Sequence, residues 1–409
     1  MKHIDEILPA SVENRRVWAH IDLDALVHNY LVSKKYIQDQ SPDTPVVAVI
    51  KADAYGHGIG PCARALYAAG CRHFAVACVE EGIAIRYALA DLAKEHAEIL
   101  ILGYTSPAHV ALLHRFDMTQ TLYSSDYASE LHAAAKDAGV RLNVHVKIDT
   151  GMHRIGFPAF TPAEAEQTVR DICALQDTCD AFCVQGLFTH LSDADSGNFC
   201  YEQWQRYLAV KQELEDRGKC PPVCHACNSP GCMRYPQTYL CGVRVGALLF
   251  GVAPVIPPEL DRNPHCNLFP AEQLRPVMRL QTRVIHTHKV AAGEPIGYGA
   301  IYRAEHDRTI ATLSAGYADG WLRAYADANV TVHTAQGDFT APMVGRICMD
   351  LCMIDVTGLP CRVGDTVTLF GQGVQSLASL ARHAGSIAYE VPCLVTARVP
   401  RIYHGSITE

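Results

Sequence analysis

The sequence has no long hydrophobic run and no block of basic residues. Its longest near-apolar run, Val245–Ile256, contains two glycines and a proline, whereas a membrane-spanning helix needs about 20 apolar residues in succession. The 35 Lys and Arg residues are interspersed among 43 Asp and Glu residues, which gives a formal net charge of −8. We therefore expect neither a membrane nor a nucleic acid as a partner.

The start of the sequence does not have the features of a secretory signal. It carries Asp5, Glu6 and Glu13 but no apolar core, and a secretory signal needs such a core. We interpret residues 1–16 as an N-terminal extension that packs on the C-terminal domain, and we expect a cytoplasmic protein.

The cysteines are numerous, 17 in all, but they lack the spacing of a structural zinc site. One CxxC pair, Cys224 and Cys227, is present, and no second pair completes a set of four ligands. Other cysteines are scattered through apolar segments such as Ala181–Val184. We expect reduced, buried thiols and no metal site.

Between residues 17 and 258, apolar β-branched runs alternate with stretches rich in Ala, Leu, Glu and Lys. This alternation is typical of a parallel sheet whose strands are joined by helices. Eight or so such units fit a closed (β/α)8 barrel of the TIM type, and a doubly wound open sheet is the main alternative. The apolar runs are Val17–Ile21, Pro45–Ile50, His73–Ala77, Ile99–Gly103, Thr119–Tyr123, Leu142–Ile148, Ala181–His190, Val223–Ala226 and Val243–Gly246.

The rest of the chain, residues 259–409, has a different sequence pattern. Prolines mark a linker-like stretch near its start, and short β-branched runs separated by turn residues follow. Only Gln375–Ala384 has the composition of a helix. The fold prediction is therefore an α/β protein: a (β/α)8 barrel over 17–258, then a mainly β C-terminal domain over 259–409. The expected strands of this domain are Val277–His288, Thr309–Leu313, Val330–Thr334, Phe339–Val344, Met353–Val356 and Thr366–Phe370.

The strongest local pattern is a buried strand that ends at Lys51 and is followed by a glycine-rich turn, Gly56–Gly60. In a (β/α)8 barrel the chemistry collects at the carboxyl ends of the strands. Partial burial there lowers the pKa of a lysine from about 10.4, so that its amine becomes a nucleophile toward carbonyl groups. An isolated lysine after a strand is more often simply solvated. The turn does not have the GxGxxG spacing of a dinucleotide site.

Polar residues also occupy the ends of later strands. Asn143, His145 and Lys147 share one face of their strand, and Arg154 follows as a second cation close to Lys147. Two neighbouring cations repel each other, and a neutral or derivatised lysine would remove that conflict. Further polar residues lie at or after the next strand ends, namely His190, His225, Asn228 and Ser229, and Arg244 lies within the last strand. Several such groups at one barrel end favour a site for a polar, anionic ligand.

These segments, in order, resemble the alanine racemase family, whose members are fold-type III enzymes dependent on pyridoxal 5'-phosphate (PLP). The resemblance spans about residues 17 to 403. It rests on Trp18–Leu26, Lys51–Gly58, Lys147–Arg154, Thr189–Leu191, His225–Ser229, Val243–Gly246, Gly297–Gly299, Gly316–Gly320, Val344–Asp350, Tyr389–Val391 and Arg398–Arg401.

The resemblance implies a PLP-dependent interconversion of L-alanine and D-alanine that uses two bases. Removing a proton from one face of Cα and returning one to the other requires a base on each side. The resemblance assigns these roles to Lys51, which also holds PLP, and to Tyr298. Tyr298 would act in the partner's active site across a head-to-tail homodimer. Nearby cations or hydrogen bonds would have to lower its pKa from about 10.

The same resemblance implies the cofactor contacts. Arg244 would face the pyridine nitrogen of PLP, His225 would orient Arg244, and His190 would stack on the ring. The phosphate would be bound by Tyr55, Asn228, Ser229, Gly246 and Tyr389, with the helix start near Asn228 contributing its dipole.

For the substrate, the resemblance implies that Arg154 bridges the phenolic oxygen of PLP and the carboxylate of the amino acid. The backbone N–H of Met349 would bind that carboxylate too, with Tyr317 also at the substrate and Asp350 in support. Lys147 would be carbamylated, and the resulting anion would orient Arg154.

Three alternatives remain. A serine or broad-specificity racemase differs by one hydroxyl in the pocket, which an apolar site discriminates by about 100-fold at most. His153 and Leu351 stand at positions that vary in the family and leave specificity open, whereas the retained Tyr389 favours alanine over serine. A fold-type III decarboxylase would lack the Gly297–Gly299 and Gly316–Gly320 motifs, and a PLP-carrier protein would lack the second domain. A role in supplying D-alanine for peptidoglycan comes from the family alone.

Overall fold

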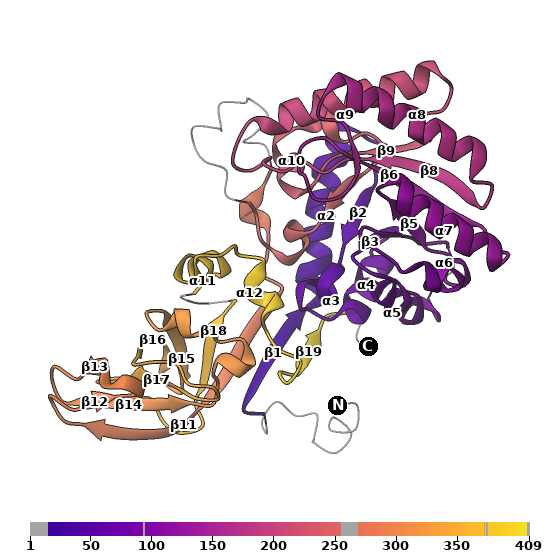
Figure 1. Ribbon diagram of the computed structural model, residues 1–409. Helices are drawn as coiled ribbons and strands as arrows, with labels where there is room; N and C mark the ends of the chain where they lie inside the picture. Colours follow the sequence, from indigo (N-terminus) through magenta and orange to yellow (C-terminus); the bar gives the residue numbers. More distant parts are fainter. Residues whose placement is uncertain (1–14, 93–94, 255–268, 372, 374, 407–409) are drawn as a thin grey trace. The chain divides into compact units, whose positions relative to one another are not determined.

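The computed structural model describes residues 15–92, 95–254, 269–371, 373 and 375–406 (Figure 1). The chain forms two compact units. We call the first the β unit (1–25, 55–58 and 276–409) and the second the barrel unit (26–54 and 59–275). The predicted packing of the extension 1–16 falls almost wholly outside the described residues.

The barrel unit is built on eight parallel strands in the order β10-β2-β3-β4-β5-β6-β8-β9, with β7 beside β6 (Figure 1). The last and first strands meet through two backbone hydrogen bonds, from Cys241 N to Cys224 O (2.9 Å) and from Arg244 N to Cys227 O (3.1 Å). The strands are β2 (Val46–Val49), β3 (His73–Val76), β4 (Glu98–Ile101), β5 (Thr119–Leu122), β6 (Leu142–Asp149), β7 (Phe157–Pro158), β8 (Phe182–Phe188), β9 (Val223–His225) and β10 (Val243–Val245). This closed arrangement confirms the barrel and excludes the open sheet.

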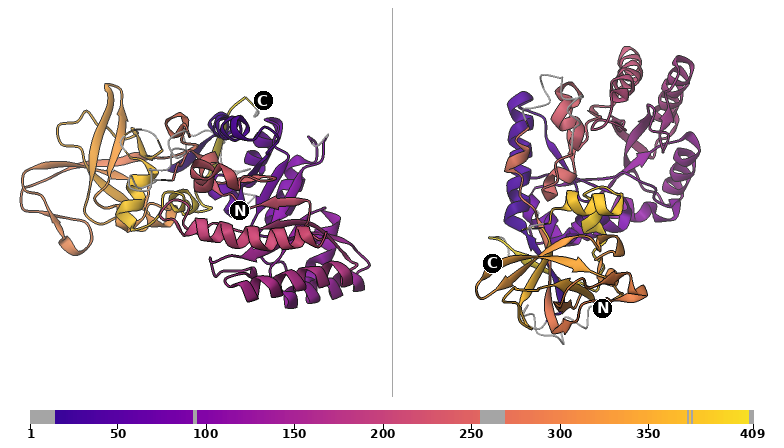
Figure 2. Two further views of the ribbon diagram at one scale, coloured as in Figure 1. Left: turned by 90° about the horizontal axis from the view of Figure 1, so that it is seen from above. Right: turned by 90° about the vertical axis from the view of Figure 1, so that its left-hand side faces the viewer.

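Helices connect consecutive strands of the barrel and lie outside them (Figure 2). Three of them, α7, α8 and α10, begin at a residue whose side chain caps the helix. Thr161 and Glu164 form a capping box at the start of α8, and the Ser124 side chain accepts from Tyr127 N at the start of α7. The helices are α2 (Leu23–Gln40), α3 (Lys51–Tyr55), α4 (Ile59–Ala68), α5 (Val79–Leu89), α6 (Val110–Arg115), α7 (Ser125–Asp137), α8 (Pro162–Thr178), α9 (Phe199–Asp216) and α10 (Ser229–Arg234), with short 3-10 helices η2 (Pro107–His109), η3 (Pro236–Thr238), η4 (Ala247–Phe250) and η6 (Ala271–Gln273).

The β unit contains an eight-stranded sheet in the order β14-β17-β16-β15-β18-β11-β1-β19, in which β14 also pairs with β11, and a separate two-stranded sheet of β12 and β13. All six strands predicted in this region are present. The strands are β1 (Val17–Asp22), β11 (Met278–Val290), β12 (Pro295–Ile296), β13 (Tyr302–Arg303), β14 (Arg308–Leu313), β15 (Asn329–Thr334), β16 (Gly337–Val344), β17 (Cys352–Asp355), β18 (Thr366–Phe370) and β19 (Arg401–His404), and the helices are η7 (Tyr298–Ala300), η8 (Tyr317–Asp319), η9 (Arg323–Tyr325), α11 (Leu377–Ala384) and α12 (Glu390–Cys393).

One strand was assigned to the wrong sheet. The run Val17–Ile21 was expected to be the first strand of the barrel, but β1 pairs antiparallel with β11 and parallel with β19. The alternation of side chains predicts a strand and says nothing about its partners, which here are far away in the sequence. The other eight predicted runs supply the eight strands of the barrel.

None of the helices in the described ranges is both long enough and apolar enough to span a membrane.

Candidate active site

Lys51 stands at the start of an unusual left-handed turn. It follows the end of β2 after one residue, Ile50, and the next four residues all have positive φ: 53° at Ala52, 52° at Asp53, 56° at Ala54 and 54° at Tyr55. For residues with a Cβ this conformation costs about 1–2 kcal/mol each. Backbone strain of this kind concentrates at functional sites, where the surroundings hold it in place.

Hydrogen bonds from the barrel unit hold this turn. The Asp53 carboxylate accepts from Ile59 N at 2.7 Å, and Asp53 N donates to Glu81 Oε1 at 3.2 Å. The other oxygen of Glu81 accepts from Ala77 N at 2.8 Å. Asp53 and Glu81 therefore fix the backbone that follows Lys51.

Four cationic side chains gather around the carboxyl ends of the barrel strands. Lys147 is only 5% exposed, and burial, together with Arg154, Arg244 and Lys51, lowers its pKa to about 7. The repulsion that the sequence predicted between Lys147 and Arg154 is therefore present. This concentration of positive charge suits an anionic ligand.

A buried carboxylate shapes the loop that carries Arg154. Asp149 Oδ1 accepts from Gly151 N, Met152 N and His153 N, each at 3.0 Å, and Oδ2 accepts from Arg154 N at 3.1 Å. His153 has a φ of 52°, a conformation that glycine adopts more readily than histidine. Asp149 is the last residue of β6, and its acceptance of four backbone hydrogen bonds was not predicted from the sequence.

Arg244 is buried and makes four hydrogen bonds within the barrel. It donates to Thr189 O at 2.7 Å, Ala226 O at 2.9 Å, His225 Nδ1 at 2.7 Å and His190 Nδ1 at 3.2 Å. Burial lowers its pKa to about 10. The structure thus brings Arg244, His225 and His190 together, as the resemblance implied.

The hydrogen bond from Arg244 fixes the tautomer of His225 and, through His225, that of His145. A guanidinium has only donors, so His225 Nδ1 accepts and its Nε2 carries the proton. That proton is donated to His145 Nδ1 at 3.0 Å. Burial, with Arg244 as a second cause, holds the pKa of His225 well below its usual value, so the imidazole is neutral. Strand alternation predicted an interior position for His145 but no role.

The residues predicted to bind phosphate divide between the two units. In the barrel unit, Ser229 Oγ accepts from Gly246 N at 2.9 Å, and Asn228 Oδ1 caps α10 by accepting from Gly231 N at 3.0 Å. In the β unit, the rings of Tyr55 and Tyr389 lie 6.4 Å apart, edge to face. Burial raises the pKa of Tyr55.

Tyr298 projects from the β unit on a short 3-10 turn. Its side chain is 70% exposed, and the glycines on both sides have φ values of 76°. An open pocket of about 560 Å³ lies beside it and is also lined by His288, Ile296 and Cys348.

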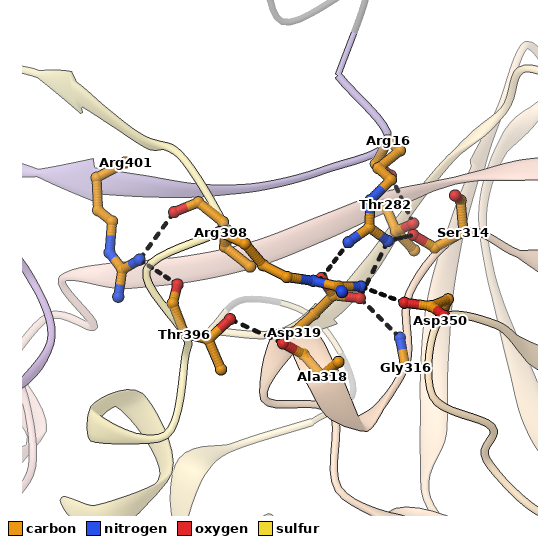
Figure 3. A network of polar contacts seen from close by, with 11 residues as sticks. Arg16, Thr282, Ser314, Gly316, Ala318, Asp319, Asp350, Thr396, Arg398 and Arg401 are labelled. Atoms are coloured by element: carbon orange, nitrogen blue, oxygen red, sulfur yellow. Dashed lines mark hydrogen bonds and ion pairs between the residues drawn. The ribbon is translucent and has the colours of Figure 1, made fainter. Parts of the chain in front are cut away.

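The loops that carry Tyr317 and Met349 are joined to each other within the β unit. Tyr317 N donates to Cys348 O at 3.1 Å, and Ala318 N donates to Met349 O at 3.0 Å. Asp350 accepts from Arg398 at 2.5 Å (Figure 3). The structure therefore brings together the predicted substrate residues of this unit.

Comparison with known proteins gives one consistent result. The family model described as alanine racemase, N-terminal domain, matches residues 21–254, and the one described as alanine racemase, C-terminal domain, matches residues 277–403. The chain belongs to the alanine racemase family. It is therefore a racemase, an isomerase that interconverts L-alanine and D-alanine.

Individual relatives agree with this assignment. An alanine racemase of Desulfovibrio desulfuricans is 38% identical over 393 residues, which cover 95% of this chain and 98% of that relative. The alanine racemase structure from Streptomyces coelicolor A3(2) matches with a TM-score of 0.84 at 30% identity and covers 96% of this chain and 98% of its own. The structure from Bacillus anthracis, which has L-Ala-P bound, matches with a TM-score of 0.82 at 30% identity over 98% of this chain and 97% of its own.

Proposed function

We propose that this racemase uses PLP, held by Lys51, and that Lys51 and Tyr298 are its two bases. The observation that carries the proposal is the cluster of Lys51, Lys147, Arg154 and Arg244 around the carboxyl ends of the barrel strands. When bound, PLP supplies an electron-withdrawing ring that makes the Cα proton of an attached amino acid removable.

The donor set of the chain fits this cofactor. PLP carries a phosphate, a phenolic oxygen and a pyridine nitrogen, and these groups need donors. Arg244 is a buried donor whose contacts to Thr189 O and Ala226 O fix its direction. Lysine at a partly buried strand end is the residue type that reacts with a carbonyl group. The phosphate contacts are proposed for Tyr55, Asn228, Ser229, Gly246 and Tyr389, and His190 is proposed to stack on the ring.

Arg244 determines the electronic character of the cofactor in this proposal. A guanidinium does not readily pass a proton to a neighbouring nitrogen, so Arg244 would leave the pyridine nitrogen of bound PLP unprotonated. The neutral His225 accepts from Arg244 and holds it in direction. A weaker electron sink restrains side reactions and confines the chemistry to proton exchange at Cα.

Proton transfer is assigned to two side chains from different units. The Lys51 amine takes or returns the proton on one face of Cα, and the Tyr298 phenol does so on the other. Arg154, the N–H of Met349 and Tyr317 hold the carboxylate of the amino acid. Asp350 supports the loop that carries Met349.

Lys147 is proposed to be carbamylated. Its lowered pKa leaves a large fraction of the amine neutral near neutral pH, and only a neutral amine attacks carbon dioxide. The nitrogen bonds to the carbon and loses a proton, which leaves an N–COO⁻ group. The anion would relieve the repulsion among the four cations and orient Arg154.

We further propose a head-to-tail homodimer with shared active sites. Support comes from exposed large apolar side chains on or next to three motif segments of the β unit, Gly297–Gly299, Gly316–Gly320 and Val344–Asp350. These are Tyr298 (70% exposed), Ile301 (60%), Met349 (54%), Leu351 (38%) and Tyr317 (37%). The domain boundary near residue 258, a cytoplasmic location and the supply of D-alanine for peptidoglycan belong to the same proposal.

Two assays on the purified protein test these assignments. The visible absorbance of protein-bound PLP should be present in the wild type and in Lys35→Ala, a change at an exposed lysine that pairs with Asp39, and absent in Lys51→Ala. Deuterium exchange at Cα should occur with L-Ala and D-Ala and be much slower with L-Ser and L-Lys. Comparable exchange with serine would instead indicate a broad-specificity racemase, and absence of bound PLP would overturn the cofactor assignment.

A further inference from the structure

Asp319 is the centre of a buried ion cluster in the β unit (Figure 3). Its side chain is fully buried and receives four hydrogen bonds. Two come from the guanidinium of Arg16, one from Arg398 Nε at 2.7 Å, and one from Gly316 N at 3.0 Å. A buried carboxylate with this many donors has a fixed position.

Arg398 extends from this cluster to a second carboxylate. Its Nη2 donates to Asp350 Oδ1 at 2.5 Å, while its Nε donates to Asp319. The hydrogen bonds that Arg398 donates to Asp319 and to Asp350 raise its pKa, so it is always charged. One planar side chain therefore bridges the Gly316–Gly320 turn and the segment that carries Met349 and Asp350.

The two segments are in close backbone contact at this point. A Cβ at Gly316 would lie 2.4 Å from both Cys348 O and Met349 O, so no larger residue fits. The hydrogen bonds from Tyr317 N and Ala318 N to this segment require the same approach. The backbone contact thus sets the distance between the two segments. Arg398 joins them a second time, through its hydrogen bonds to Asp319 and Asp350.

Arg398 is itself held on the chain segment that precedes β19. Thr396 Oγ1 donates to Ala318 O at 2.8 Å, and Arg401 donates to Thr396 O at 2.6 Å and Val399 O at 2.8 Å (Figure 3). Anchored on both sides, Arg398 cannot follow Asp350 if that loop moves, so it restrains the loop.

We propose that Arg398 is a positioning residue for the substrate carboxylate. By bridging Asp319 and Asp350, it holds the N–H of Met349 and the side chain of Tyr317 in the arrangement that binds the amino acid. This inference rests on the proposed roles of Met349 and Tyr317. The Arg398–Asp350 contact is half exposed, with side-chain exposures of 39% and 55%. Such a pair adds little stability, so its effect is on geometry.

The test compares three variants of the holoenzyme: Arg398→Lys, Asp350→Asn and the double variant. Lysine keeps the charge but cannot form the planar bridge to two carboxylates. We expect KM for both alanine enantiomers, and the inhibition constant for propionate, to rise about tenfold in each single variant. The kcat and the absorbance of bound PLP should change little. In the double variant the rise should be no larger than in either single variant, because both changes break the same bridge.

Arg308→Lys is the matched control. Arg308 pairs with Asp355 at 3.1 Å within the same unit, and neither residue belongs to the two segments. Its KM and propionate affinity should equal those of the wild type.

Three results would overturn the inference. They are an unchanged KM with a lowered melting temperature, a loss confined to kcat, or KM effects that multiply in the double variant. If Arg398→Lys does not fold, the KM comparison uses Asp350→Asn only. This variant leaves the hydrogen bonds of the buried Asp319 intact. Failure of the proposed function can be told apart from failure of the Arg398 inference, because the wild type itself would then lack alanine exchange or bound PLP.

Discussion

At the scale of single residues, the interior of the barrel keeps histidines neutral. His225 accepts from a guanidinium and donates to His145, and both side chains are buried. Burial lowers the pKa of His145 to about 4 from its usual 6.5, although Glu98 acts in the opposite direction. A protonated His145 could not accept from His225, so the chain of hydrogen bonds and the low pKa support each other.

This arrangement predicts a pH dependence of stability. Below pH 6.5 the unfolded chain binds a proton at His145 that the folded chain does not bind until about pH 4. Stability is therefore complete above pH 6.5 and is lost as pH falls toward 4, by up to about 1.4 kcal/mol per pH unit for this one residue. His145→Asn retains an acceptor for His225 and removes the titration.

Urea unfolding at several pH values measures this effect. The free energy of unfolding should fall less steeply between pH 6.5 and 4 in His145→Asn than in the wild type. Equal slopes would mean that His145 titrates normally in the folded protein. As a control, changing the exposed His114 to Asn should leave the slope as it is.

Lys147 gives a second prediction at this scale. Since its pKa is lowered to about 7, the neutral amine increases as pH rises through that value, and the carbamate should form more readily. Nuclear magnetic resonance with isotope-labelled carbon dioxide should detect one slowly exchanging carbamate signal, which Lys147→Ala removes. Lys147→Ala should also raise KM, because Arg154 loses its anionic partner. No signal at mildly alkaline pH, together with an unchanged KM, would count against carbamylation.

Some of these residues were predictable from the sequence and others were not. Lys51, Lys147 and His190 stand at or near the ends of predicted strands and Arg244 stands within one, so the rule for parallel barrels indicated where their side chains would gather. Asp319 and Arg398 act through partners that are remote in sequence, and nothing in a local pattern reveals such partners.

At the scale of elements, the left-handed turn after Lys51 is the feature that sequence patterns miss. Its residues, Ala52 to Tyr55, have no preference for positive φ. The turn is held because Asp53, one of its own residues, accepts a hydrogen bond from Ile59 N and donates one to Glu81. β1 is a similar case. Its sequence pattern predicted a strand, but only the fold showed that the strand pairs with β11 and β19.

The turn predicts opposite effects for two alanine-to-glycine changes. Ala52 and Ala133 are both exposed, but Ala52 has a φ of 53° and Ala133 lies within the regular helix α7. Ala52→Gly should raise the free energy of unfolding by up to about 1 kcal/mol, because glycine adopts positive φ without strain. Ala133→Gly should lower it by about 1 kcal/mol. Urea unfolding of the two variants and the wild type measures these changes in the free energy of unfolding. If both changes lower it, residue 52 is not strained.

At the scale of the whole molecule, the order of motifs along the sequence predicted the two domains, because most of each unit is folded from one long continuous segment. Eight barrel strands follow one another between Val46 and Val245, and six strands of the eight-stranded sheet of the β unit lie between Met278 and Phe370. What the sequence left open is the contribution of the chain's ends to the β unit, since β1 and β19 pair with each other across almost the full length of the protein.

The proposed dimer can be tested by mixing two inactive proteins. If Lys51 of one subunit and Tyr298 of its partner form one active site, a heterodimer of Lys51→Ala with Tyr298→Phe contains one intact site and one site with both defects. Random reassociation makes half of the dimers mixed, so about a quarter of the wild-type activity should return. The control mixes Lys51→Ala with Lys51→Ala/Tyr298→Phe, in which every possible site lacks Lys51 and no activity can return. If both bases belonged to one subunit, each subunit of the first mixture would remain defective, and mixing would restore nothing.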